Sequence, residues 1–189
     1  MTSAKPAPLN RLRQLWRDGR PTFGAIATIP SIQTVQIMAR SGIDWIIVDL
    51  EHGPIDLGTA HAMIVATSGT PCVPMVRIAA NEPWLAKAPM DIGALGINFP
   101  MICSRADAEK AVRSVRYPPK GDRLWGPFHA PFRWGVSMAD YTCTVWIEGM
   151  VASAPKVGRP SRHCWRRRLS GADVADVTCR APSNAVRQR

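Results

Sequence analysis

The sequence predicts an α/β fold, an incomplete (β/α) barrel followed by an irregular C-terminal tail. Apolar strands alternate with helical segments at intervals of about 25 residues, which is typical of successive βα units. The strands are apolar without alternation, as expected for a parallel sheet covered on both faces. Four units are clear, whereas a closed barrel needs eight and about 250 residues, and the chain has 189. We therefore expect about four to five βα units.

The first elements predict a helix, a strand, a second helix and a second strand. Residues 10–20 have an amphipathic pattern, with Leu and Trp on one side and arginines around them. The apolar run 23–29 ends at a proline and indicates a buried strand. Ser31 is a suitable N-cap for a helix that Gly42 closes. Residues 45–49 form the next apolar strand.

The same alternation continues through the middle of the chain. We expect a helix over residues 57–67, a strand over 72–77 and a helix that begins at Pro83. Residues 96–99 predict a fourth strand. Ser104 then caps a further helix, which the run Tyr117-Pro118-Pro119-Lys120-Gly121 terminates.

The charge distribution divides the chain into a near-neutral body and a basic tail. The net charge is +10, but residues 1–149 hold 15 Lys+Arg and 12 Asp+Glu, against 9 and 2 in residues 150–189. We interpret residues 1–20 as a helical lead-in and 21–149 as the partial barrel domain. The tail, 150–189, lacks periodicity, and we expect it to be disordered or translated out of frame.

Composition excludes several classes of protein. No run of about 18 apolar residues is present, which argues against a membrane span. The N-terminus lacks the apolar stretch of a secretory signal, so a cytoplasmic protein is expected. The five scattered cysteines form no C-x-x-C pair and predict neither a zinc knuckle nor a disulfide framework. Nucleic-acid binding by the tail stays a weaker alternative, because aromatic residues are not interleaved with the basic ones.

Charged residues gather where two predicted strands end. Asp49, Glu51 and His52 follow the second strand, and Arg77 ends the third. In a βα barrel the carboxyl ends of the strands form one rim, which carries the chemistry. These four side chains are therefore candidates for a catalytic site.

Each candidate has a catalytic and a structural interpretation. Asp49 and His52 suit a dyad in which the carboxylate orients the imidazole as a base, and the alternative is a structural histidine. Arg77 suits the oxygens of a 2-oxo acid or an enolate. It also suits an ion pair with Asp49 or Glu51, and the two roles are compatible. Glu51 is either a group near a metal or a surface charge.

Several motifs in order resemble the HpcH/HpaI aldolase family, the hydroxy-oxo-acid aldolases. The likeness covers about residues 20–141. The histidine-bearing loop distinguishes this family from citrate-lyase and phosphoenolpyruvate-binding enzymes on the same barrel. The matching segments are Gly42-Ile43-Asp44-Trp45, Asp49-Leu50-Glu51-His52-Gly53-Pro54, Pro74-Met75-Val76-Arg77, Asp91-Ile92-Gly93-Ala94-Leu95-Gly96-Ile97, Phe99-Pro100-Met101-Ile102, Arg116-Tyr117-Pro118-Pro119-Lys120-Gly121-Asp122-Arg123 and Gly126-Pro127 through Arg133-Trp134-Gly135 to Tyr141.

The resemblance implies a TIM-type barrel of the phosphoenolpyruvate/pyruvate-binding kind and a class II aldolase. Such an enzyme cleaves a 4-hydroxy-2-oxo acid reversibly to pyruvate, or a close relative, and an aldehyde. By position, His52 with Asp49 would be the base, and Arg77 would bind the keto oxygen. Gly93 and Ala94 would shape the pyruvate pocket. A divalent metal, Mg²⁺ or Mn²⁺ and sometimes Co²⁺, would act as the Lewis acid.

The resemblance weakens where the family holds its metal. Glu148, in Val145-Trp146-Ile147-Glu148-Gly149, is a candidate ligand that comes about eight residues early, and Asp173 is a fainter second candidate. The alternative function is a truncated homologue that is catalytically inactive. The family forms homo-oligomers, partly through C-terminal helices, and this chain has no recognisable version of them.

Overall fold

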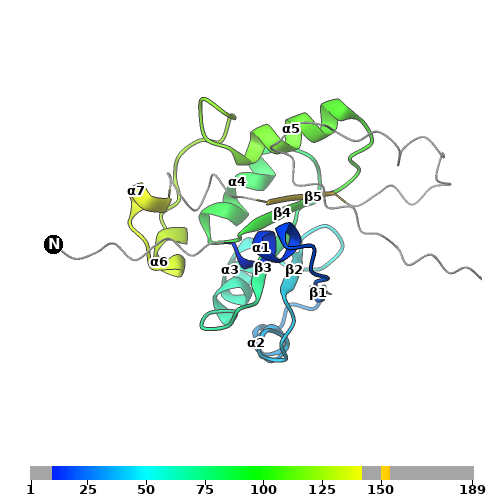
Figure 1. Ribbon diagram of the computed structural model, residues 1–189, viewed down its shortest axis with the longest axis vertical. Helices are drawn as coiled ribbons and strands as arrows, with labels where there is room; N and C mark the ends of the chain where they lie inside the picture. Colours follow the sequence, from blue (N-terminus) through cyan, green and yellow to red (C-terminus); the bar gives the residue numbers. More distant parts are fainter. Residues whose placement is uncertain (1–9, 142–149, 154–189) are drawn as a thin grey trace, which may run out of the picture.

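The computed structural model describes residues 10–141 and 150–153, which form one parallel five-stranded sheet with helices packed around its outer side (Figure 1). The strand order follows the chain, so each strand pairs in parallel with the next. This is the TIM-type partial barrel that the sequence predicts. The strands are β1 (Gly24–Ala27), β2 (Trp45–Asp49), β3 (Val73–Arg77), β4 (Gly96–Phe99) and β5 (Met150–Ser153). The helices are α1 (Arg11–Arg17), α2 (Ile32–Arg40), α3 (Leu57–Ala66), α4 (Pro83–Asp91), α5 (Arg105–Val115), α6 (Ala130–Trp134) and α7 (Met138–Asp140).

Local sequence signals account for where the helices begin. The Ser31 side chain accepts a hydrogen bond from the backbone N–H of Thr34 at the start of α2. Ser104 and Asp107 form a reciprocal capping box at the start of α5. Pro83 occupies the first turn of α4, where a missing N–H costs nothing. The expected helices and strands up to α5 are therefore confirmed.

The expectation that the first strand is buried is wrong for most of its length. Ile26 is 47% exposed, and the flanking Phe23 and Ile29 are 73% and 65% exposed. The physical reason is that β1 is an edge strand, because among residues 10–141 and 150–153 only β2 pairs with it. Ala27, at its carboxyl end, is buried.

The fifth strand lies beyond the predicted end of the barrel domain. The sequence predicts the boundary after residue 149, but β5 begins at Met150 and pairs with β4 from Gly96 to Phe99. Length does not explain why the sequence pattern misses β5, because β1 and β4 also have four residues; β5 lies where the alternation of strand and helix patterns is no longer visible in the sequence. The barrel domain therefore extends to at least Ser153.

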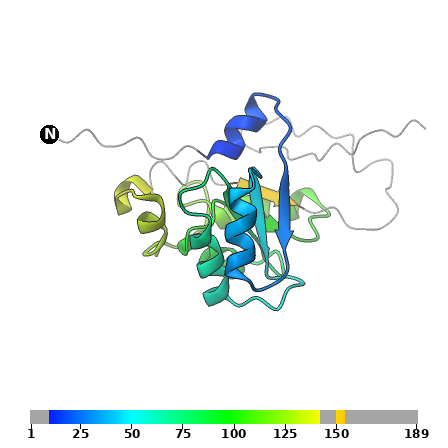
Figure 2. The ribbon, with the colours of Figure 1, turned by 90° about the horizontal axis from the view of Figure 1, so that it is seen from below.

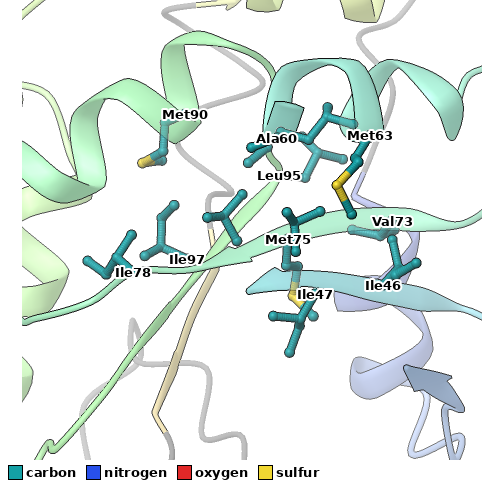
Figure 3. Close-up of a cluster of buried hydrophobic side chains, with 14 of the residues drawn as sticks. Ile46, Ile47, Ala60, Met63, Val73, Met75, Ile78, Met90, Leu95 and Ile97 are labelled. Carbon is teal, nitrogen blue, oxygen red and sulfur yellow. The ribbon is translucent and has the colours of Figure 1, made fainter. Parts of the chain in front are cut away.

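The core lies between the sheet and helices α3 and α4. Figure 3 shows Ala60 and Met63 of α3 on one side of the sheet, with Met63 reaching toward Ile46, whereas the side chain of Met75 points to the other side. These side chains are all at most 3% exposed. Continuous apolar strands can therefore bury both of their faces, as the sequence pattern indicates.

Helix α1 closes the end of the sheet at which the strands begin (Figure 2). Leu12 is fully buried. The Asn10 side chain donates to the carbonyl of Leu95, just before β4, at 3.3 Å. Arg11 forms a 3.0 Å ion pair with Asp44, just before β2. These contacts leave the carboxyl ends of the strands at the opposite, polar end. No helix in the described part of the chain is long and apolar enough to cross a membrane.

Truncation of Leu12 tests whether α1 is part of the folded unit. Leu12→Ala removes a fully buried side chain and should lower the free energy of unfolding by about 2–5 kcal/mol. The matched control is Leu124→Ala, because Leu124 is 71% exposed and its truncation should change little. Urea unfolding followed by circular dichroism measures both, and equal effects of the two substitutions would contradict the docking of α1.

Candidate active site

Three polar side chains form a row across the carboxyl ends of β2, β3 and β4. The sheet register pairs Asp49 with Arg77, and Arg77 with Asn98. Residues paired in register on neighbouring parallel strands project from the same face, about 4.8 Å apart. The predicted convergence of Asp49 and Arg77 is therefore observed, and Asn98 extends the row by one strand.

Asp49 and Arg77 form a two-point ion pair. Arg77 Nε donates to Asp49 Oδ1 at 2.8 Å, and Nη2 donates to Oδ2 at 2.6 Å. The Asp49 side chain is fully buried and the Arg77 side chain is 15% exposed. Because a buried carboxylate is costly without partners, this pairing explains how Asp49 is tolerated in the core.

The turn after β2 completes the environment of Asp49. The backbone N–H groups of Glu51 and His52 donate to Asp49 Oδ1 at 3.0 and 3.3 Å. Burial by itself raises the pKa of Asp49, but the hydrogen bonds from Arg77 and from these two amides outweigh it. The pKa therefore lies below its ordinary value of 3.8. Asp49 is a carboxylate held by four donors.

Gly53 lets the turn lie close to the neighbouring strand. A Cβ at this position would lie 2.7 Å from the carbonyl oxygen of Asp49 and 2.9 Å from that of Thr28. Both neighbours are backbone atoms, and displacing them costs more free energy than moving a flexible side chain. A side chain at residue 53 would therefore push the loop that carries Glu51 and His52 away from β1.

The expected pairing of the Asp49 and His52 side chains is not found. The carboxylate of Asp49 is directed to Arg77 and to the backbone of the turn, so it bonds the amide of His52 rather than the ring. The imidazole lies instead beside Glu51, with Nε2 3.6 Å from Oε2, and its side chain is 67% exposed. Glu51 also lies 3.3 Å from Arg77 Nε, and so it stands between the two candidate functional groups.

Gly93 and Ala94 lie at the wrong end of the sheet for the pocket that we expected them to shape. They precede β4, whereas Asp49 and Arg77 end their strands. Ala94 is fully buried, and the carbonyl of Gly93 accepts a hydrogen bond from Trp134 Nε1 at 3.1 Å. Gly93 has a φ of 109°, and a Cβ at this position would lie 3.1 Å from Cγ of Arg133, so this turn packs closely against α6.

The described residues do not by themselves make a metal site. No group of three or more His, Cys, Asp or Glu side chains gathers anywhere in residues 10–141. The oxygens of Asp49 are already bound to Arg77. Glu148 and Asp173 lie outside the described residues, so their assignment as ligands stays a prediction. The carboxyl end of β5 is at Ser153, downstream of Glu148.

Asn98 was missed in the sequence because a single asparagine in an apolar strand carries no motif. Its side-chain Oδ1 is buried and has no hydrogen-bond partner among the described residues. The useful signal was its place at the end of β4, which is the criterion that identified Arg77. Close by, Met101 adopts a left-handed backbone with a φ of 52° and is 58% exposed.

Comparison with known proteins identifies close sequence relatives. The sequence profile described as HpcH/HpaI aldolase/citrate lyase matches residues 29–154. A hydroxypyruvate/pyruvate aldolase of Roseobacter denitrificans is 34% identical over 118 residues, covering 62% of this chain and 46% of that protein. A protein of the same name from Roseovarius nubinhibens is 34% identical over 139 residues, covering 74% and 54%. The chain thus spans about half the length of the curated relatives it matches.

A solved structure shows the same arrangement of elements. An HpcH/HpaI aldolase/citrate lyase family protein from Burkholderia cenocepacia superposes with a TM-score of 0.69 at 33% identity. The superposition covers 76% of this chain and 58% of that one. The fold of the described residues is therefore that of part of this barrel.

Removal of the Asp49 charge should destabilise the protein in a pH-dependent way. Asp49→Asn removes the carboxylate that binds Arg77 at two points and leaves Glu51, 3.3 Å away, as its carboxylate neighbour; the substitution should cost about 3 kcal/mol at pH 7. Because the pKa of Asp49 is lowered in the folded state, the ion pair stabilises the protein above the unfolded pKa of about 3.9. That contribution is lost as the pH falls through the folded pKa. In urea denaturation, the difference in the free energy of unfolding between Asp49→Asn and the wild type should therefore narrow below about pH 4.

The control for this experiment is Asp122→Asn. Asp122 accepts two 2.8 Å hydrogen bonds from Arg113, so the bonding pattern is the same, but both side chains are more than half exposed. Solvent screens such a pair, and its loss should be within the error of the measurement. A loss of stability at Asp49 no larger than at Asp122 would show that the buried pair is not a structural anchor.

Proposed function

The chain belongs to the HpcH/HpaI aldolase/citrate lyase family, and we propose that it is a metal-dependent carbon–carbon lyase. The reaction is reversible aldol cleavage of a 4-hydroxy-2-oxo acid to pyruvate, or a close relative, and an aldehyde. The observation that carries the proposal is the Arg77 guanidinium, which Asp49 holds rigidly at the strand ends beside the His52 loop. The partners are small molecules, and two of the relatives are named hydroxypyruvate/pyruvate aldolases.

Arg77 provides the group that stabilises negative charge. Asp49 occupies Nε and one hydrogen of Nη2, so both hydrogens of Nη1 are left for a ligand. Because the pair fixes the guanidinium, these donors are already oriented before substrate binds. They suit the C2 oxygen, which gains charge as the enolate forms.

His52 provides the proton-transfer group. Its ring is largely exposed, on the loop that follows β2, where a substrate can reach it. In the cleavage direction it accepts the proton of the C4 hydroxyl, and the C3–C4 bond breaks to release the aldehyde. The electron pair passes to the C2–C3 unit and forms the enolate of pyruvate. Its C3 takes a proton from water while His52 returns the hydroxyl proton to solvent, so the reaction consumes and releases one proton each.

A divalent cation, when bound, supplies Lewis acid chemistry toward the substrate oxygens. Glu148 and Asp173 are the ligands that we predict from the family resemblance. The described residues contribute the basic and guanidinium groups of the site and do not form a three-ligand set. For this reason the steps above are assigned only to Arg77 and His52.

Release of pyruvate from a 4-hydroxy-2-oxo acid, in the presence of Mn²⁺ or Mg²⁺, tests the proposal on the full chain. His52→Asn and Arg77→Lys should each lower kcat/KM by about 10²-fold or more, and a chelator should abolish the activity until metal is restored. Lactate dehydrogenase coupled to NADH oxidation measures the pyruvate. His61→Asn is the matched control. It makes the same substitution at a histidine that lies on α3 beside His129, and not on the loop after β2. Absence of pyruvate with every metal would support the alternative, a catalytically inactive homologue.

A further inference from the structure

We propose that Asn98 is a substrate-binding residue that selects a 2-oxo acid with a hydroxyl on C3, such as hydroxypyruvate, over pyruvate. This inference rests on the proposed function, because it assumes that Arg77 binds the 2-oxo acid. The inference gives a role to Asn98, the side chain beside Arg77 in the row at the strand ends. That role is to determine which 2-oxo acid the site prefers.

The first argument is the position of Asn98. The sheet register places it opposite Arg77 at the carboxyl end of β4. Ile97 and Phe99 alternate with it and are fully buried, while Asn98 is half-buried. Strands lie about 4.8 Å apart. The Arg77 guanidinium points to Asp49 on β2, so Asn98 lies on the other side of β3, where a small molecule that extends from the guanidinium across the row would meet its amide.

The second argument is that nothing in the described structure uses this amide. Its Oδ1 is buried without a hydrogen-bond partner. An unpartnered buried polar atom costs about 1–3 kcal/mol, and such groups are rare in native proteins. The Oδ1 of Asn81 is also buried without a partner, but its Nδ2 donates to the carbonyl of Asp107 at 3.0 Å and so ties the loop after β3 to α5. Asn98 makes no such structural contact among the described residues.

The third argument is the chemistry that an asparagine recognises. The carboxylate and keto oxygens of pyruvate only accept hydrogen bonds, and Arg77 already supplies donors for them. A hydroxyl on C3 both donates and accepts, as the amide does. Because no described group holds either end of the amide, rotation about χ2 can present Oδ1 to that hydroxyl. A hydroxylated acid can therefore satisfy an atom that pyruvate leaves unpaired.

The experiment compares Asn98→Leu with Asn81→Leu in the full chain. In the aldol direction, with one aldehyde and Mn²⁺, kcat/KM is measured for hydroxypyruvate and for pyruvate. Asn98→Leu should lower the hydroxypyruvate-to-pyruvate ratio by about three- to tenfold, the value of one neutral hydrogen bond. The same substitution should leave Tm unchanged or raise it, because it removes an unpaired buried oxygen. Asn81→Leu also removes an unpaired buried oxygen, but it breaks the hydrogen bond from Nδ2 to the carbonyl of Asp107, so it should lower Tm and leave the ratio unchanged.

A second measurement separates this inference from the proposed function. Binding of hydroxypyruvate and of pyruvate to the Mn²⁺-loaded chain, by isothermal titration calorimetry, gives the same ratio without turnover. If the wild-type chain binds both acids but cleaves nothing, the lyase proposal fails and the binding ratio alone decides the role of Asn98. An unchanged ratio in Asn98→Leu, an equal loss for both acids, or no binding by the wild-type chain would overturn the role of Asn98.

Discussion

The ion pair between Asp49 and Arg77 is the interaction on which the site depends. Two charges are taken out of water at the ends of adjacent strands, and such a pair survives only with short, well-directed hydrogen bonds. The register of β2 and β3 supplies the required proximity, and the two backbone amides after β2 donate to Oδ1 of Asp49. One carboxylate thus fixes the direction of the guanidinium and the path of the loop that carries His52.

Most of the fold followed from the sequence because each strand is a short apolar run and each helix has a local start signal. The apolar segment 45–49 and the capping serine at 104 needed no tertiary information. Proximity of Asp49 and Arg77 also followed, since parallel strands bring their carboxyl ends to one edge. The fifth strand and the exposure of β1 could not be predicted from the sequence, because both depend on which strands pair with each other.

The errors in the site share a physical cause: residue type and spacing do not fix the direction in which a polar group points. Asp49 and His52 are three residues apart, but a tight turn aims the carboxylate at the backbone amides and at Arg77. Gly93 lies near β4 in sequence but at its beginning, so its carbonyl meets Trp134 instead of a substrate. Asn98 carries no motif and emerges only once the register places it beside Arg77.

The charges of the described site favour the divalent cation that we propose for the reaction. Asp49 and Glu51 bring two carboxylates against the one guanidinium of Arg77, so the cluster carries one formal negative charge. A 2-oxo acid is itself an anion, and its enolate carries one more negative charge than the acid. The donors of Arg77 attract it, whereas the carboxylate of Glu51, 3.3 Å from Arg77 Nε, repels it. A divalent cation at the same rim reverses the balance, which is the electrostatic reason for including one in the proposed reaction.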